Sequence, residues 1–158
     1  MLTGETTSTR IYNTIKQALP SEVKQYGLWN NQLTKLKEGN INPVRFPAVF
    51  VSFENNYDSL SSGVQQIQGI FVLNICLESL KQSDEYNLRF KDYIYQQLSY
   101  QLPKLGFQDF YRSFETQDTD FDNLIVWSQE YTYSYIDSLA QDRIIAIHPY
   151  VITPDVHY

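Results

Sequence analysis

Three aspartates alternate along a short polar stretch, at Asp118, Asp120 and Asp122, and this spacing imitates the start of a calcium-binding loop. Such a loop also needs a glycine at its sixth position, where the chain turns sharply, and a glutamate at its twelfth, where both carboxylate oxygens bind the ion. Asn123 and Gln129 occupy these two positions. We therefore expect an exposed hairpin tip, and no metal site, at these aspartates.

The other residue types that serve catalysis are few and isolated. His148 and His157 lack the HxxxH or HExxH spacing of a zinc site and have no cysteine partner nearby. Cys76 lies inside a strand pattern, which favours a buried thiol over a nucleophile. The chain has no GxSxG, P-loop or GxGxxG motif. We expect no catalytic residue, no metal and no cofactor, and hence no enzyme.

Composition indicates a folded chain. At 158 residues the protein suits one domain with a substantial core, and its 13 tyrosines, 9 phenylalanines and 2 tryptophans exclude a disordered polar chain. No charge-free apolar run approaches the ~20 residues that a membrane helix needs. Residues 1–10 are polar and lack the apolar core of a signal peptide. We expect a protein made and used in a cytoplasm, without a membrane.

Charge is unevenly distributed along the chain. Residues 109–137 carry seven acids and one base, whereas residues 1–45 carry six bases and three acids. The protein is therefore expected to have an acidic end and a mildly basic end. This charge distribution suits head-to-tail association of like subunits better than it suits binding the phosphates of a nucleic acid. The alternative is that both charged parts of the chain are simply solvated surfaces that bind no partner.

Apolar periodicity predicts two helices. Apolar residues recur at every fourth position in Thr9 to Leu19, which Pro20 ends, and again in Ser83 to Leu102, which Pro103 and Gly106 close. The segment Glu22 to Leu36 fits neither the helical nor the strand period. We interpret it as an irregular hairpin.

Alternating patterns predict four strands in two antiparallel hairpins. The first hairpin has a polar loop at Asn55 to Ser62, and the second has an acidic tip at Glu115 to Asp122. The four expected strands are Ala48 to Glu54, Val64 to Glu78, Phe107 to Phe114 and Asn123 to Ile136.

These elements predict an α+β fold. Two hairpins with alternating strands make one mostly antiparallel sheet with a single buried face, covered by the N-terminal helix and the long central helix. We assign this domain to residues 1–137. Residues 138–158 form a C-terminal extension, which Pro149 and Pro154 restrict to an extended arm.

Two sets of side chains are candidates for a subunit or partner interface. One face of a predicted strand carries Tyr131, Tyr133 and Tyr135. Tyrosine suits a partly solvated subunit contact, because its ring packs against the partner while its hydroxyl keeps a hydrogen bond. The alternative is a core face with the hydroxyls at its rim. The C-terminal arm is apolar without a domain left to bury it. We expect it to pack on a neighbour, with an edge strand on its own sheet as the alternative. Its interface candidates are Ile144, Ile145, Ile147, Tyr150, Val151 and Ile152.

The stretch from Trp29 to Glu54 carries a family resemblance. It contains the polar segment Asn30-Asn31-Gln32 and then the strand Phe46-Pro47-Ala48-Val49-Phe50-Val51, and the order of elements extends the match over roughly Arg10 to Asp137. In these features the chain resembles the tail terminator, or tail completion, proteins of tailed bacteriophages. These are small α+β subunits at the head end of the tail tube.

The resemblance implies a structural role in the virion, with assembly in the host cytoplasm. Such proteins form a ring, usually hexameric, that caps the tail tube and joins it to the head connector or neck proteins, and DNA passes through the lumen without specific binding. Glu115, Asp118, Asp120 and Asp122 are then expected at an acidic lumen or its rim, because fixed cations would retard a polyanion. Another virion connector, such as a head completion or tube-type protein, and a small ligand-binding or metal-dependent enzyme domain are the alternatives.

Overall fold

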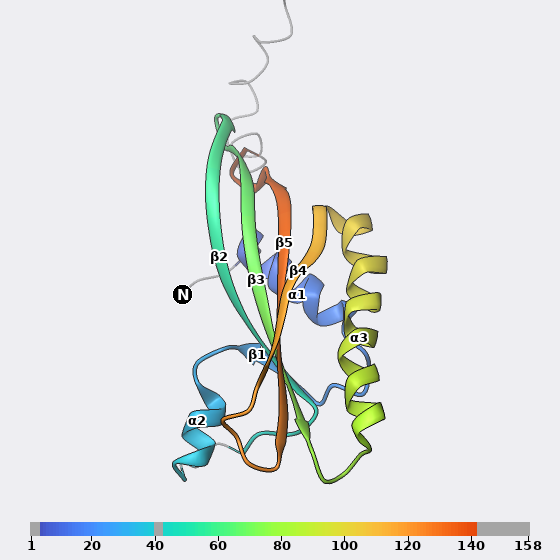
Figure 1. Cartoon of the computed structure of the whole chain (residues 1–158). Coiled ribbons are helices and arrows are strands. Elements are labelled where there is room, and N and C mark those ends of the chain that lie inside the picture. Colours follow the sequence, from blue (N-terminus) through green and yellow to red (C-terminus); the bar gives the residue numbers. More distant parts are fainter. Residues whose placement is uncertain (1–3, 40–42, 142–158) are drawn as a thin grey trace, which may run out of the picture.

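The computed structural model of the chain describes residues 4–39 and 43–141. Within these residues the helices are α1, α2, α3 and the short 3-10 helix η1, and the strands are β1 to β5 (Figure 1). Their bounds, in chain order, are α1 Thr7–Ala18, β1 Gln25–Leu28, α2 Gln32–Lys37, β2 Ala48–Ser61, β3 Val64–Glu78, α3 Asp84–Gln101, η1 Leu102–Leu105, β4 Gln108–Asp118 and β5 Leu124–Asp137.

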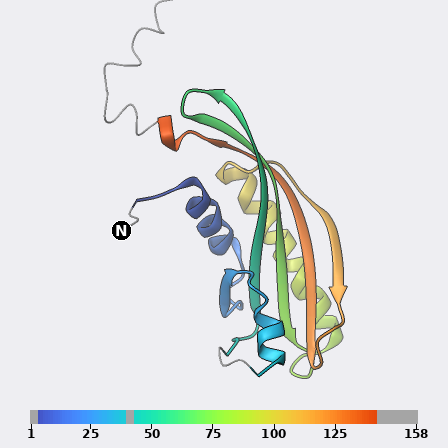
Figure 2. The same ribbon diagram turned by 90° about the vertical axis from the view of Figure 1, so that its left-hand side faces the viewer.

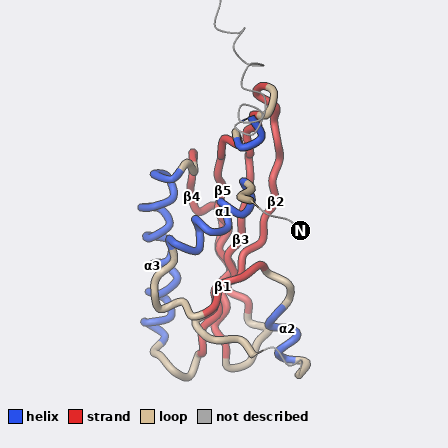
Figure 3. The backbone as a smooth tube through the Cα atoms, turned by 180° about the vertical axis from the view of Figure 1, so that it is seen from behind, coloured by secondary structure: helices blue, strands red, loops and turns tan. Residues whose placement is uncertain are grey.

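The described strands form one sheet in the order β1-β2-β3-β5-β4. Strand β1 is parallel to β2, and the other three neighbouring pairs are antiparallel. The predicted α+β class is confirmed, with two hairpins, an N-terminal helix and one long central helix. Figure 3 shows β2 and β3 running on past the upper end of β4, so that their hairpin projects at one end of the molecule.

Local signals set the ends of both long helices. The Thr6 hydroxyl accepts a hydrogen bond from the Thr9 backbone N–H, and the Thr9 hydroxyl accepts one from the Thr6 backbone N–H, which satisfies the first turn of α1. Ser83 caps α3 in the same way through the backbone N–H of Tyr86. Gly106 ends η1 with a φ of 99°, a left-handed conformation that glycine adopts without strain.

The main core lies between one face of the sheet and helices α1 and α3. Phe71 of β3 is fully buried at its centre, and its ring lies 5.0 Å from that of Tyr131 and 5.7 Å from that of Tyr133, measured between centroids. Ile15 of α1 and Ile94 of α3 are also fully buried in this cluster. The predicted helices therefore cover the predicted face.

The tyrosine face of β5 belongs to this core, which corrects its assignment to a subunit contact. Tyr131, Tyr133 and Tyr135 are 0%, 2% and 8% exposed. The Tyr131 hydroxyl donates to Gln129 Oε1 at 2.6 Å and the Tyr133 hydroxyl to Asn55 Oδ1 at 2.7 Å. Helices cover the rings, and partners within the subunit satisfy these two hydroxyls, so the core alternative is correct for all three residues.

The sheet buries part of its second face as well, contrary to the expected single buried face. Leu33 of α2 packs there with Ala48, Phe50, Cys76 and Val126, at the end of the sheet nearest β1. Cys76 is fully buried, as predicted, and burial raises the pKa of its thiol to about 12. The segment Glu22 to Leu36 supplies this cover: it forms β1 and the start of α2 rather than an irregular hairpin.

Both expected hairpin loops are shorter than predicted. Residues 55–61 of the polar loop continue β2, with Asn55 opposite Gly69 and Tyr57 opposite Ile67. Glu115 to Asp118 of the acidic tip likewise continue β4. The polar side chains of these strand ends led to the prediction of loops. Residues on an uncovered stretch of sheet need not be apolar, so a strand there can lack the apolar alternation.

The C-terminal extension is described only as far as residue 141. Residues 139–141 form a helical turn, and the Gln141 backbone N–H donates to the Gly63 carbonyl at the tip of the β2–β3 hairpin. The interface candidates Ile144, Ile145, Ile147, Tyr150, Val151 and Ile152 lie outside the described residues, so their packing stays a prediction.

Candidate functional site

The four predicted lumen acids do not form one group. Glu115 lies on β4 toward α3, and only 23% of its side chain is exposed. Asp118, Asp120 and Asp122 lie at the end of the β4–β5 hairpin, where Asp118 Oδ1 accepts a hydrogen bond from the Asp120 backbone at 2.9 Å. The assignment of Glu115 to an open acidic rim is therefore corrected.

Glu115 belongs to an ionic cluster between α3 and β4. Lys91 Nζ lies 3.0 Å from both Glu115 Oε2 and Asp92 Oδ1, and Arg112 Nη1 lies 3.3 Å from Glu115 Oε1 and 3.1 Å from Asp92 Oδ1. Gln129 donates to Glu115 Oε1 at 2.9 Å and to the Lys91 carbonyl at 3.0 Å. Two cations thus balance two carboxylates, and this cluster fixes α3 on the sheet.

Asp92 makes the cluster sensitive to acid. Partial burial alone would raise the pKa of Asp92, but hydrogen bonds from Lys91 and Arg112 outweigh it and hold the pKa below its ordinary 3.8. The stabilisation is therefore present above the unfolded pKa and is lost as the pH falls through the folded pKa.

We expect Asp92→Asn to flatten the fall in unfolding free energy between about pH 4 and about pH 2. Because 49% of the Asp92 side chain is exposed, the change at neutral pH is under about 1 kcal/mol. Urea unfolding at several pH values measures it, with exposed Asp58→Asn as the control. An unchanged pH profile in Asp92→Asn would contradict the assignment.

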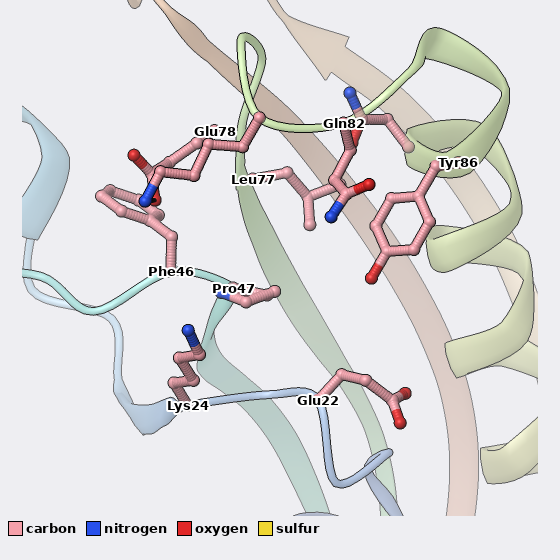
Figure 4. Close-up of a pocket in the computed structure, with 10 residues that line it drawn as sticks. Glu22, Lys24, Phe46, Pro47, Leu77, Glu78, Gln82 and Tyr86 are labelled. Atoms are coloured by element: carbon pink, nitrogen blue, oxygen red, sulfur yellow. Dashed lines mark ion pairs between the residues drawn. The ribbon is translucent and has the colours of Figure 1, made fainter.

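A cavity of about 260 Å³ lies between the start of α3 and the Phe46–Pro47 bend (Figure 4). Glu22 and Lys24 line it from one side and Leu77 and Tyr86 from the other. Asn87 also lines it; this side chain is buried, and neither of its amide atoms has a hydrogen-bond partner among the described residues. The lining thus includes both charges and the amides of Gln82 and Asn87, which suits weak polar binding.

The second face of the sheet is uncovered beyond α2. A hollow of about 440 Å³ there is lined from all four long strands, by residues such as Asn56, Gln68, Tyr111 and Thr132. Strands β2, β3 and β5 contain no lysine or arginine, and the single arginine of β4, Arg112, binds the cluster beneath α3. The uncovered face therefore carries amides, hydroxyls and acids without a cation.

Sequence reasoning missed this face, although its signal was present. Strands β2, β3 and β5 each lack a lysine and an arginine. Counting charges along the sequence did not reveal this, because it drew attention to the acids of residues 109–137. Side-chain alternation alone does not tell which polar residues stay open to solvent, because α2 covers only one end of this face.

Both margins of the sheet are open among the described residues. Strand β1 is short and pairs with β2 only from Ala48 to Val51, so β2 has no partner on that side from Ser52 onward. At the other margin β4 pairs only with β5. Figure 2 shows α1 and β1 on one side of the sheet and β4 on the other. Unpaired strand edges are sites for association with another chain.

Beside β1, a hollow of about 370 Å³ gathers three bases that lie far apart in the sequence. Lys16 of α1, Lys24 before β1 and Arg45 before β2 all line it. No ion pair involves any of the three within the described part of the chain. Three of the six bases of residues 1–45 thus lie at the β1 margin.

Comparisons with known proteins give no family assignment. No protein-family model matches the chain, and no curated protein sequence matches it significantly. Within residues 4–39 and 43–141, no three His, Cys, Asp or Glu side chains are grouped so that they could hold a metal ion.

None of the helices described is both long and apolar enough to cross a lipid bilayer.

Proposed function

We propose that this protein is a structural subunit of a phage neck or tail, forming a ring that caps the tail tube and joins it to the head connector. The observation that carries the proposal is the uncovered sheet face without a lysine or arginine. That face is mostly polar and partly acidic, and it also exposes Tyr111 and Phe114 of β4. It lines the lumen in the proposed ring, with α1 and α3 turned outward.

A cation-free wall suits a channel for DNA. Each fixed lysine or arginine facing a duplex neutralises a phosphate and adds salt-dependent affinity for the DNA, and this affinity would slow the passage of the DNA through the channel. Amides and hydroxyls keep the wall wet without that attraction. DNA then passes through without specific binding, and Asp118, Asp120 and Asp122 lie at one end of the sheet rather than along the wall.

The partners follow from the same proposal. A closed ring, hexameric in the family that the sequence resembles, stacks on the tail tube protein at one end and on the neck or head-connector proteins at the other. The protein is then a virion component assembled in the host cytoplasm. The C-terminal extension of residues 138–158 packs across a neighbouring subunit or a tail partner in this proposal.

The runner-up with an observation in its favour is a small ligand-binding domain. The cavity beside Asn87 favours it, because an unpartnered buried amide is compatible with a polar ligand. The cavity is small, however, and the Asn87 amide atoms have almost no solvent-accessible surface in this conformation. A ligand would need a movement of α3 to reach them.

Negative-stain imaging and light scattering of the purified chain test the ring, which we expect to have an open channel.

We further expect that Asn56→Lys with Thr132→Lys, on the uncovered face, keeps the ring and raises affinity for a short blunt-ended DNA duplex. At about 50 mM salt the gain should exceed tenfold over the control and fall steeply as salt is added.

The matched control is Asn13→Lys with Gln96→Lys, which places the same charge on the exposed sides of α1 and α3. Equal DNA affinity in the two double variants would show that the sheet face does not line the channel. A chain that stays monomeric at concentrations up to about 1 mM would contradict the ring itself.

A further inference from the structure

The two margins of the sheet complement each other in strand direction. Strand β4 runs opposite to β2, because three antiparallel steps separate them, and β1 runs parallel to β2. Copies placed side by side in the same orientation therefore bring β4 of one against the β1 margin of the next as an antiparallel neighbour. A contact between unlike margins closes into a ring when its rotation permits.

The charges of these margins lie at the same level of the sheet. Register places Asp118 of β4 opposite Val126, Val126 opposite Cys76, Cys76 opposite Ala48, and Ala48 opposite Gln25 of β1. Lys24 directly precedes Gln25. The acidic β4–β5 turn and the basic hollow are thus at equal height on opposite margins, so a neighbour needs little axial shift to bring them together.

Neither set of charges is neutralised within the described chain. Asp118, Asp120 and Asp122 take part in no ion pair there, and neither do Lys16, Lys24 and Arg45. Lys37 contacts the acidic turn without pairing with its carboxylates: its Nζ donates to the Asp120 carbonyl at 3.1 Å and lies 6.0 Å from the centroid of the Phe121 ring. The side-chain charges of both surfaces remain available to a partner.

Both margins also carry exposed apolar side chains. On β4, Tyr111 and Phe114 are 56% and 59% exposed. A groove of about 650 Å³ between α1 and β1 is lined by Tyr12, Leu28 and Phe53, among others. Register puts Phe114 level with Ser52 of β2, next to Phe53. The exposed aromatic side chains are level with this groove but point to the uncovered face, whereas Phe53 packs on the face beneath the helices, so they do not enter it.

We propose that a second copy of this chain docks at the β1 margin, with its β4–β5 turn entering the hollow of Lys16, Lys24 and Arg45. This contact rests on the proposed function, since it is the repeating interface of the ring. Because every chain carries both surfaces, each surface in a closed ring contacts its complement on a neighbouring subunit. Charge complementarity sets the register, and the two open strand edges supply the rest of the contact.

A charge-swap experiment tests this interface. One variant carries Lys24→Glu with Arg45→Glu, and the other carries Asp120→Lys with Asp122→Lys. Alone, each variant places like charges at every contact, and we expect ring assembly to weaken at least about tenfold. Mixed in equal amounts, the two restore opposite charges at every contact of an alternating ring. Light scattering and negative-stain imaging should show rings in the mixture alone.

Recovery on mixing also shows that both variants fold. Lys104→Glu, an exposed charge reversal on η1, is the matched control and should assemble as the wild type does. If each swapped variant forms rings as readily as the wild type, the interface is wrong while the proposed ring stands. If both lose rings and mixing restores none, the interface is also wrong. If the wild type forms no ring, the proposed function fails and the interface fails with it.

Discussion

Replacing Phe71 with alanine is expected to lower the unfolding free energy by about 3–5 kcal/mol. Phe71 is fully buried, and five aromatic rings surround it with centroid distances from 5.0 to 6.5 Å. The substitution leaves a cavity that these rings cannot close, since β2, β3, β4 and β5 and the segment before β4 hold their backbones. Urea unfolding of the monomer measures the loss.

Leu80→Ala is the matched control for this prediction. Leu80 is 83% exposed, so its truncation is expected to change the unfolding free energy by less than about 0.5 kcal/mol. A loss below about 1 kcal/mol in Phe71→Ala would mean that the aromatic cluster is not the centre of the core. Since Phe71 lies far from both margins, ring assembly of the folded fraction should be unaffected.

Replacing Lys91 with methionine is expected to cost about 3 kcal/mol, through charge rather than volume. Methionine keeps most of the apolar stem, but among the described residues it leaves Glu115 paired with Arg112 alone. Lys91 is 8% exposed, and removing one partner of a buried pair leaves an uncompensated charge. Glu115 retains some solvent contact, which favours the lower end of the usual 3–5 kcal/mol.

Two companion variants separate charge from packing. Lys81→Met breaks an exposed pair with Glu78 and is expected to cost less than about 1 kcal/mol. Adding Glu115→Gln to Lys91→Met removes the uncompensated carboxylate, so part of the lost unfolding free energy should return. If Lys91→Met unfolds within about 1 kcal/mol of the wild type, the cluster does not hold α3 on the sheet.

Several elements could be read directly from the sequence because their signals are local. The fourfold spacing and caps of α1 and α3 follow from neighbouring residues, as does the alternation of β3 and β5. The α+β class follows from them, because two hairpins with one apolar face need helices to cover it. The buried state of Cys76 was predictable for the same reason.

Strand β1 and the helix after it were not readable in this way. Four residues, Gln25 to Leu28, carry too little pattern to indicate a strand, and their parallel pairing depends on the distant segment Ala48 to Val51. The same holds for the ends of β2 and β4, whose polar side chains mimic loops. Sheet partners, rather than local preference, decided these segments.

The sequence by itself determined the class of fold, the apolar face of each long element and the separation of a basic from an acidic part of the chain. The tertiary structure alone decided which surfaces remain for a partner. It closed the tyrosine face beneath the helices, neutralised Glu115 with Lys91 and Arg112, and gathered Lys16, Lys24 and Arg45 at one margin. The reason is physical: periodicity is a property of neighbouring residues, whereas exposure and charge pairing depend on residues that only the folded sheet brings together.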